Sequence, residues 1–246
     1  MSETKVAVVI PARYASSRFP GKPLALLCGR PMIQHVYEKA SASRADLVLV
    51  ATDHEGIAEA VVAFGGRAVM TSENHPSGTD RIAEAVAKTD PSIGIVINVQ
   101  GDEPLIPTAV IDELIDLMKS DPGLEMATVA VPAERSKLNE NNVKVVFDTD
   151  RNALYFSRSM IPFHRAGGVE APVYLHWGIY AYRKSALERF VALPPGILEN
   201  CEKLEQLRAL ENGIRIRVVL SNLSSIGVDT PEDLAAAERR LMEESK

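Results

Sequence analysis

Residues 6–24 read VAVVIPARYASSRFPGKPL, and this stretch decides the fold because an apolar run leads directly into a cationic loop. A run such as Val6–Ile10 is typical of a central strand in a parallel sheet, and ligands bind at the loops that leave the carboxyl ends of such strands. Gly21 lets the backbone approach a ligand closely, and phosphate oxygens suit the three cations of the loop, Arg13, Arg18 and Lys22. The loop therefore predicts a polyphosphate site, rather than ordinary surface cations beside a proline-rich turn.

Composition and missing motifs exclude several classes of protein. The chain has 246 residues, 46% of them hydrophobic, which is enough for one large domain with a buried core. A formal net charge of -6 argues against a general nucleic-acid binder. The first loop lacks both G-x-x-x-x-G-K-[ST] and G-x-G-x-x-G, which disfavours a P-loop or a dinucleotide-binding fold. Cys28 and Cys201 form no metal or disulfide pattern, and no apolar run predicts a membrane span, so we expect a cytoplasmic protein.

Strand-like and helix-like segments alternate in the first half of the chain. This βαβ series predicts an α/β fold with a mostly parallel sheet that is covered on both faces. The expected strands are Val6–Ile10, Leu47–Ala51, Ala68–Met70 and Ile93–Val99. The expected helices are Pro31–Ser41, Ile57–Phe64, Asp80–Lys88 and Pro107–Lys119.

The rhythm changes after Met126, where strands follow one another without intervening helices. The expected strands are Ala127–Val131, Val143–Phe147, Ala153–Ser157 and Val173–Tyr182, with a hairpin loop at 148–152. We therefore expect a single domain over residues 1–246 with an antiparallel subdomain at about 132–182, a kind of excursion that often covers an active site or forms a dimer contact. Helices at Glu199–Asn212 and Pro231–Glu244 close the chain, the second one capped by Thr230.

Two acidic residues indicate a magnesium site beside the phosphate loop. Asp102 follows the strand Ile93–Val99, and Asp229 is expected just after a short apolar strand and before the last helix. Both can meet the cationic loop at one edge of the sheet, and Mg²⁺ prefers one or two carboxylates together with phosphate oxygens. The alternative for Asp102 is an ordinary turn residue, and helix capping by Thr230 explains the second turn without explaining its carboxylate.

Polar residues elsewhere admit both structural and functional interpretations. Ser77–Arg81 opens a helix and could bind a phosphate or a base, although it also resembles an ordinary cap. His176, Gly178 and Tyr180 share one face of an expected strand, and with Arg158 they could bind an acidic, hydroxyl-rich molecule. Glu205 and Gln206 lie on an expected helix, where such residues usually form a solvated face. No pairing indicates covalent or transition-metal catalysis.

Taken together, these segments resemble the 3-deoxy-manno-octulosonate cytidylyltransferases over nearly the whole chain. The resemblance rests on nine segments: Ile10–Leu24, Ala51–His54, Ser77–Arg81, Asn98–Pro104, Val143–Phe147, Ala153–Arg158, Gly178–Tyr180, Lys203–Arg208 and Gly227–Asp233. It implies a Rossmann-like nucleotide-diphosphosugar transferase fold and a homodimer. It also implies transfer of CMP from CTP to the 2-hydroxyl of 3-deoxy-manno-octulosonate (Kdo) with release of pyrophosphate, the step that activates Kdo for lipopolysaccharide.

The resemblance also implies roles for individual residues. It places on CTP the residues Pro11, Ala12, Arg13, Arg18, Lys22, Ser77, Gly78 and Arg81. It makes Asp102 and Asp229 the ligands of Mg²⁺, and these act in catalysis together with Arg13 and Lys22. It places in the Kdo pocket the residues Gln100, Arg158, His176, Tyr180, Glu205 and Gln206.

Two departures from the family pattern affect the choice of sugar. Trp177 stands where the family often has leucine, and Gly196–Ile197 lies in a variable loop. An amino-Kdo analogue or sialic acid are therefore alternative acceptors, although the first loop differs from the PARGGSKGIPGKN pattern of the sialic acid enzymes. A nucleotide sensor without catalysis would keep the cationic loop but would not need two metal-binding acids.

Overall fold

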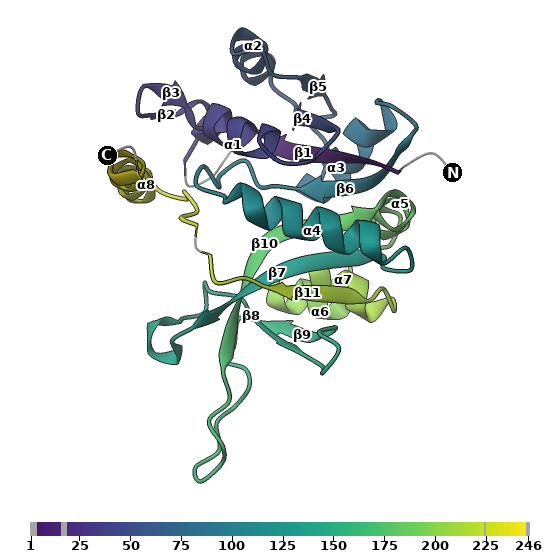
Figure 1. Ribbon diagram of the computed structural model, residues 1–246, viewed down its shortest axis with the longest axis vertical. Coiled ribbons are helices and arrows are strands. Elements are labelled where there is room, and N and C mark those ends of the chain that lie inside the picture. Colours follow the sequence, from purple (N-terminus) through teal and green to yellow (C-terminus); the bar gives the residue numbers. More distant parts are fainter. Residues whose placement is uncertain (1–3, 16–18, 224, 245–246) are drawn as a thin grey trace.

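The computed structural model describes residues 4–15, 19–223 and 225–244, which form a nine-stranded sheet flanked by helices (Figure 1). The strand order along the sheet is β11-β7-β10-β6-β1-β4-β5, and β8 and β9 extend it beside β10. All neighbours on the main path pair in parallel except β10, which runs antiparallel to both β6 and β7. The mostly parallel α/β architecture expected from the sequence is confirmed.

The strands are short and apolar, as the alternation of strand-like and helix-like segments along the sequence predicts. They are β1 (Lys5–Ala12), β4 (Leu47–Thr52), β5 (Ala68–Met70), β6 (Ile93–Asn98), β7 (Met126–Ala133), β8 (Lys144–Phe147), β9 (Ala153–Ser157), β10 (Val173–Arg183) and β11 (Ile216–Leu220). A separate two-stranded sheet joins β2 (Leu26–Leu27) to β3 (Arg30–Pro31).

Helices cover both faces of the sheet and complete a hydrophobic core on each face. They are α1 (Met32–Ser41), α2 (Glu55–Ala63), α3 (Gly78–Ala87), α4 (Thr108–Ser120), α5 (Lys184–Val191), α6 (Ile197–Glu202), α7 (Gln206–Glu211) and α8 (Pro231–Glu244), with short 3₁₀ turns η1 (Lys22–Leu24) and η2 (Arg135–Lys137). Strand β1 shows how the sheet serves both cores, because successive side chains point to opposite faces. Val6, Val8 and Ile10 pack with α1, α2 and α4, whereas Ala7 and Val9 pack with α3, α5 and α7.

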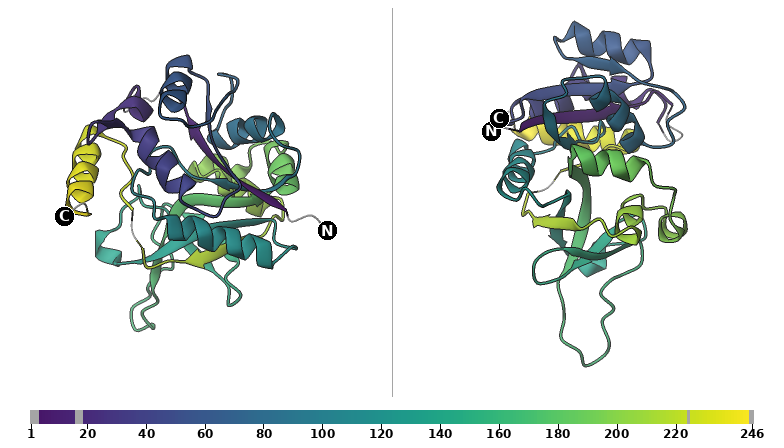
Figure 2. Two further views of the ribbon diagram at one scale, coloured as in Figure 1. Left: turned by 45° about the horizontal axis from the view of Figure 1, so that its top comes forward. Right: turned by 90° about the vertical axis from the view of Figure 1, so that its right-hand side faces the viewer.

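The antiparallel region extends the central sheet rather than standing apart from it. β10 pairs with β7 along most of its length, and on its other side Tyr180–Arg183 pair with β6 while Tyr174 and Leu175 pair with β8. A hairpin joins β8 to β9, as expected, and the segment 158–172 between β9 and β10 projects away from the sheet (Figure 2). The register of β10 shifts between Trp177 and Tyr180, which interrupts the simple alternation expected along this strand.

Two details of the expected secondary structure are wrong. The single helix expected at Glu199–Asn212 is two helices, α6 and α7, because Lys203 adopts a left-handed conformation with φ of 55°. Asp229 does not follow a strand directly, since β11 ends at Leu220 and an irregular segment leads to the helix. The expected cap of that helix is confirmed, because Thr230 Oγ1 accepts from the Asp233 N–H at 3.2 Å while the Asp233 carboxylate accepts from the Thr230 N–H at 2.9 Å. Among the described residues, none of the helices is both long and apolar enough to span a membrane.

Candidate functional site

A pocket of about 310 Å³ lies where β1 and β6 end, at the edge of the sheet predicted from the sequence. Its wall combines the first loop, the start of α3 and the two acidic turns. The lining residues are Pro11, Ala12, Arg13, Lys22, Pro23, His75, Pro76, Ser77, Gly78, Arg81, Gln100, Gly101, Asp102 and Asp229. The structure thus brings together most of the residues predicted to bind CTP and metal, while Arg18 lies outside the described residues.

Lys22 connects the two acids across this pocket. Its Nζ donates to Asp102 Oδ2 at 2.6 Å and to Asp229 Oδ1 at 3.2 Å. One cation thus already lies within bonding distance of both carboxylates, although their turns are 127 residues apart in sequence. Gly21, with φ of 70°, starts the 3₁₀ turn that carries Lys22, and its N–H donates to the Tyr14 carbonyl oxygen at 3.0 Å. Tyr14 in turn stacks on His54 with ring centroids 4.1 Å apart, which anchors Tyr14.

The donor set of the two acids fits magnesium. No group of three or more His, Cys, Asp or Glu side chains among the described residues could hold a metal ion. Two carboxylates at an open pocket match the preference of Mg²⁺ for few protein ligands and for phosphate oxygens from a substrate. The pair Asp102 and Asp229 is therefore suited to a metal that arrives with a nucleotide.

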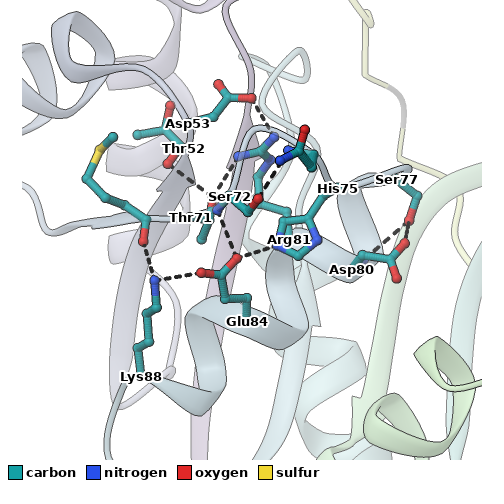
Figure 3. Close-up of polar contacts among 12 residues, drawn as sticks. Thr52, Asp53, Thr71, Ser72, His75, Ser77, Asp80, Arg81, Glu84 and Lys88 are labelled. Atoms are coloured by element: carbon teal, nitrogen blue, oxygen red, sulfur yellow. Dashed lines mark hydrogen bonds and ion pairs between the residues drawn. The ribbon is translucent and has the colours of Figure 1, made fainter.

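The turn at the start of α3 forms the opposite wall. The Ser77 hydroxyl caps the helix by accepting from the N–H groups of Thr79 and Asp80, and it donates to the Asp80 carboxylate at 2.6 Å. Arg81 is only 3% exposed, because its guanidinium donates to Thr71 Oγ1 and Asp53 Oδ2, each at 2.6 Å (Figure 3). Ser77 and Arg81 therefore line the pocket while already bonded to Asp80 and to Thr71 and Asp53, respectively.

His75 lies on the same wall and is a residue that sequence reasoning missed. Its Nε2 is hydrogen-bonded to Glu84 Oε2 on α3 (Figure 3). Hydrogen bonds from Lys88, the Ser72 N–H and His75 lower the pKa of Glu84 to about 2. The available sequence signal was that His75 lies two residues before the predicted turn at Ser77–Arg81. Its contact with Glu84 arises only in the folded chain.

A second pocket of about 480 Å³ lies beside the first one. It is lined by Glu103, Val131, Asn141, Asn142, Val143, Leu175, His176, Trp177, Gly178, Leu204, Gln206, Leu223, Ser225 and Gly227. Glu103 follows Asp102, and Gly227 precedes Asp229 by two residues, so the same two segments separate the pockets. Two residues predicted to bind sugar, His176 and Gln206, lie here, and Gln100 lies in the first pocket.

His176 is half-buried and Gln206 is buried, and their polar atoms differ in hydrogen bonding. His176 Nε2 is hydrogen-bonded to Thr128 Oγ1 at 3.0 Å, and its ring packs against Phe156 and Tyr180. Burial lowers the pKa of His176 to about 3, so the imidazole is neutral at physiological pH. Gln206 is 5% exposed, and its Nε2 has no hydrogen-bond partner among the described residues. Such an amide is expected to donate to a ligand.

Three other residues predicted to bind sugar do not line either pocket. Tyr180 packs between the rings of His176 and Tyr182. Glu205 Oε2 accepts from Thr79 Oγ1 at 2.7 Å, and burial raises its pKa, while its Oε1 is buried without a hydrogen bond. Arg158 donates to three backbone carbonyl oxygens, of Glu140, Glu202 and Lys203. Its guanidinium therefore holds segments of the chain together in this structure.

Glu103 is a further residue that the sequence did not single out. Ser225 Oγ donates to its Oε2 at 2.5 Å, and Trp177 also bonds to this carboxyl group. Burial, with smaller contributions from Asp102 and Asp229, raises the pKa of Glu103 to about 7. Trp177 stands where the family often has leucine. It therefore gives Glu103, the acid between the two pockets, a hydrogen-bond partner that leucine could not provide.

Lys144 supports the wall of the second pocket, although it does not itself line the pocket. Its side chain is fully buried, and its ammonium donates to the carbonyl oxygens of Asn139, at 2.9 Å, of Asn142 and of Arg158. No carboxylate among the described residues pairs with it directly. The ammonium therefore fixes the segment that supplies Asn141 and Asn142 to the pocket.

Comparisons with known proteins agree with this geometry. The sequence model described as Cytidylyltransferase matches residues 7–216. The chain is 54% identical to a 3-deoxy-manno-octulosonate cytidylyltransferase of Thermodesulfovibrio yellowstonii, covering 95% of this chain and 96% of the relative. It is 52% identical to an 8-amino-3,8-dideoxy-manno-octulosonate cytidylyltransferase of Shewanella frigidimarina, covering 96% and 98%.

Solved structures give the same result. The structure of CMP:2-keto-3-deoxy-manno-octonic acid synthetase complexed with CTP superposes with a TM-score of 0.93 at 44% identity, covering 98% of this chain and 99% of that one. A cytidylyltransferase from Leptospira borgpetersenii shares the fold, with a TM-score of 0.65 at 18% identity. The chain therefore belongs to the cytidylyltransferase family, and within it to the 3-deoxy-manno-octulosonate cytidylyltransferases.

Proposed function

We infer that this enzyme transfers CMP from CTP to the 2-hydroxyl of Kdo and releases pyrophosphate, which activates Kdo for lipopolysaccharide synthesis. One observation supports this most strongly: two pockets flank the segments of Asp102–Glu103 and Gly227–Asp229. The first pocket contains cations and two acids, as a metal-bound triphosphate requires. The second contains neutral His176 and the unpartnered amide of Gln206, which suit the hydroxyl groups of a sugar.

The first loop would bind the triphosphate. Arg13 is exposed at the pocket, and Lys22 already lies inside it. Both cations would stabilise the charge that grows on the departing pyrophosphate, since fixed donors act where charge develops. Asp102 and Asp229 would hold Mg²⁺, which when bound neutralises phosphate charge and lowers the pKa of a coordinated hydroxyl. No protein base is required in this scheme.

The sugar would lie in the second pocket, with its reacting hydroxyl toward the two acids. The Gln206 amide would donate to the sugar, and His176 would supply a neutral hydrogen-bonding edge. A sugar contact of Arg158 would require its guanidinium to give up backbone carbonyl partners, whereas Glu205 could offer its unbonded Oε1. Tyr180 would have to reach the sugar from between the rings of His176 and Tyr182.

The main alternative to Kdo as the acceptor sugar is its 8-amino analogue. Relatives named for either acceptor are more than 50% identical to this chain. We propose Kdo, and the test is pyrophosphate release from CTP and Mg²⁺ with each sugar, with sialic acid and no sugar as controls. A kcat/KM at least about tenfold higher for Kdo supports the assignment. A higher value for the amino sugar would reverse it.

We also propose a cytoplasmic homodimer. The projecting segment 158–172 exposes Phe163 and Val169 at 85% and 93%, and exposed apolar side chains of this kind mark contact surfaces. Cys28 and Cys201 are both free, as expected in a reducing compartment. Light scattering should give twice the monomer mass, and Phe163→Asp should lower it. A monomeric wild-type enzyme would refute the dimer.

A further inference from the structure

His75 occupies a part of the first pocket that differs in charge from the Lys22 side. Lys22 donates to both Asp102 and Asp229, whereas His75 is adjacent to the uncharged residues Pro76, Ser77 and Gly78. The cations near His75 are neutralised, because Arg81 pairs with Asp53 and Lys88 pairs with Glu84, each at 2.6 Å. A triphosphate would favour the Lys22 side, and the base of a nucleotide suits the His75 side.

Glu84 fixes both the orientation and the proton of His75. Its low pKa keeps Glu84 a carboxylate, which can only accept hydrogen bonds. His75 Nε2 is therefore the donor in their hydrogen bond, and in the neutral imidazole Nδ1 is left as an acceptor. Lys88 and the Ser72 N–H bind the same carboxylate and hold it in place (Figure 3).

The Nδ1 atom of His75 has no partner among the described residues, whereas its neighbours do. Ser77 bonds to Asp80, Arg81 bonds to Thr71 and Asp53, and Gln100 Nε2 donates to Asn98 Oδ1 at 3.2 Å. The His75 side chain is 20% exposed, so its ring remains accessible from the pocket. It is thus an oriented acceptor at the uncharged side of the site.

Cytosine and uracil differ in the group that such an acceptor would meet. Cytosine carries the N4 amino group, a donor, where uracil carries O4, an acceptor. We propose that His75 accepts a hydrogen bond from cytosine N4 and that Glu84 is its positioning residue, so that this pair sets the preference for CTP over UTP. This inference rests on the proposed use of CTP.

The test compares CTP and UTP with His75 variants. His75→Phe keeps a planar ring but removes the acceptor, and we expect the ratio of CTP to UTP affinity to fall by about 10- to 100-fold. His75→Asn, whose carbonyl oxygen can replace Nδ1, should restore part of the ratio. His164→Phe is the matched control, because His164 is exposed in the projecting segment, and its ratio should equal that of wild type.

Nucleotide affinities are measured by calorimetry with Mg²⁺ and without sugar, so the acceptor assignment does not affect the result. Circular dichroism and melting temperature establish whether each variant is folded. If His75→Phe does not fold, the ratio of CTP to UTP affinity is compared between wild type and His75→Asn. Equal weakening of CTP and UTP in the variants, or an unchanged ratio, would overturn the inference. A wild-type enzyme that binds neither nucleotide would instead refute the proposed function itself.

Discussion

Lys144→Met should destabilise the fold and weaken sugar binding without changing CTP binding. Lys144 is fully buried, and its ammonium holds three backbone carbonyl groups at the edge of the second pocket. Methionine has a similar length and no charge, so the substitution removes the donors without opening a large cavity. The carbonyl groups of Asn139, Asn142 and Arg158 would lose their shared partner.

The size of the effect follows from opposing contributions. Hydrogen bonds from a charged group contribute about 1.5–3 kcal/mol each, while burying an ammonium costs several kcal/mol and offsets much of their sum. That same burial lowers the pKa of Lys144. Asn139 is exposed and can rehydrate its carbonyl oxygen. We therefore expect the free energy of unfolding to fall by about 2–4 kcal/mol.

Urea denaturation measures the stability, and pyrophosphate release measures the KM values of CTP and Kdo. Lys137→Met is the matched control, because the Lys137 side chain is 74% exposed and pairs with the likewise exposed surface residue Glu134. We expect it to change the unfolding free energy by less than about 0.5 kcal/mol. The sugar KM of Lys144→Met should rise several-fold. A loss of stability below about 1 kcal/mol, or an equal rise of both KM values, would refute the reasoning.

Three further predictions concern the two pockets. Asp102→Asn and Asp229→Asn should each reduce turnover by at least about 100-fold with the fold intact, and full activity of either variant at saturating Mg²⁺ would argue against the two-acid site. Arg13→Ala should raise the KM of CTP much more than that of Kdo, and steady-state kinetics would expose a wrong assignment if the reverse occurred. His176 has a pKa of about 3 when folded against an ordinary value of 6.5, so the stability it contributes is present above pH 6.5 and is lost as the pH falls toward 3. The loss of unfolding free energy between pH 7 and pH 5 should be about 2 kcal/mol smaller in His176→Gln, and identical pH slopes would contradict this.

The sequence predicted the architecture well because hydrophobic periodicity reports burial directly. The continuous apolar run Val6–Ile10 indicated both the strand and its central position. The break between α6 and α7 was not predictable from propensity, since neither glycine nor proline marks it. Lys203 adopts the left-handed conformation, and Leu204 packs into the core, a tertiary contact that outweighs the helical pattern.

The phosphate and metal residues were also easier to find than the sugar residues. Arg13, Lys22 and Asp102 follow strands or join the first loop, and the topology of a parallel sheet brings such positions together. His75 acts through Glu84 on α3, and Lys144 acts through the backbone of the segment 139–142. Neither partner belongs to a motif that the sequence analysis identified. Pairings of this kind exist only after folding, so no local pattern announces them.

The continuous path of β10 limits how the choice of sugar can be re-engineered. β10 pairs with β7 along most of its length, with β6 at one end and with β8 at the other. A hybrid enzyme that imports residues 132–182 from a relative would interrupt β7 and place a foreign strand between two native ones. Gln206 and Gly227 would still come from the recipient, because they lie outside that block. Changing acceptor preference therefore calls for point substitutions along the pocket wall, since this fold offers no exchangeable sugar module.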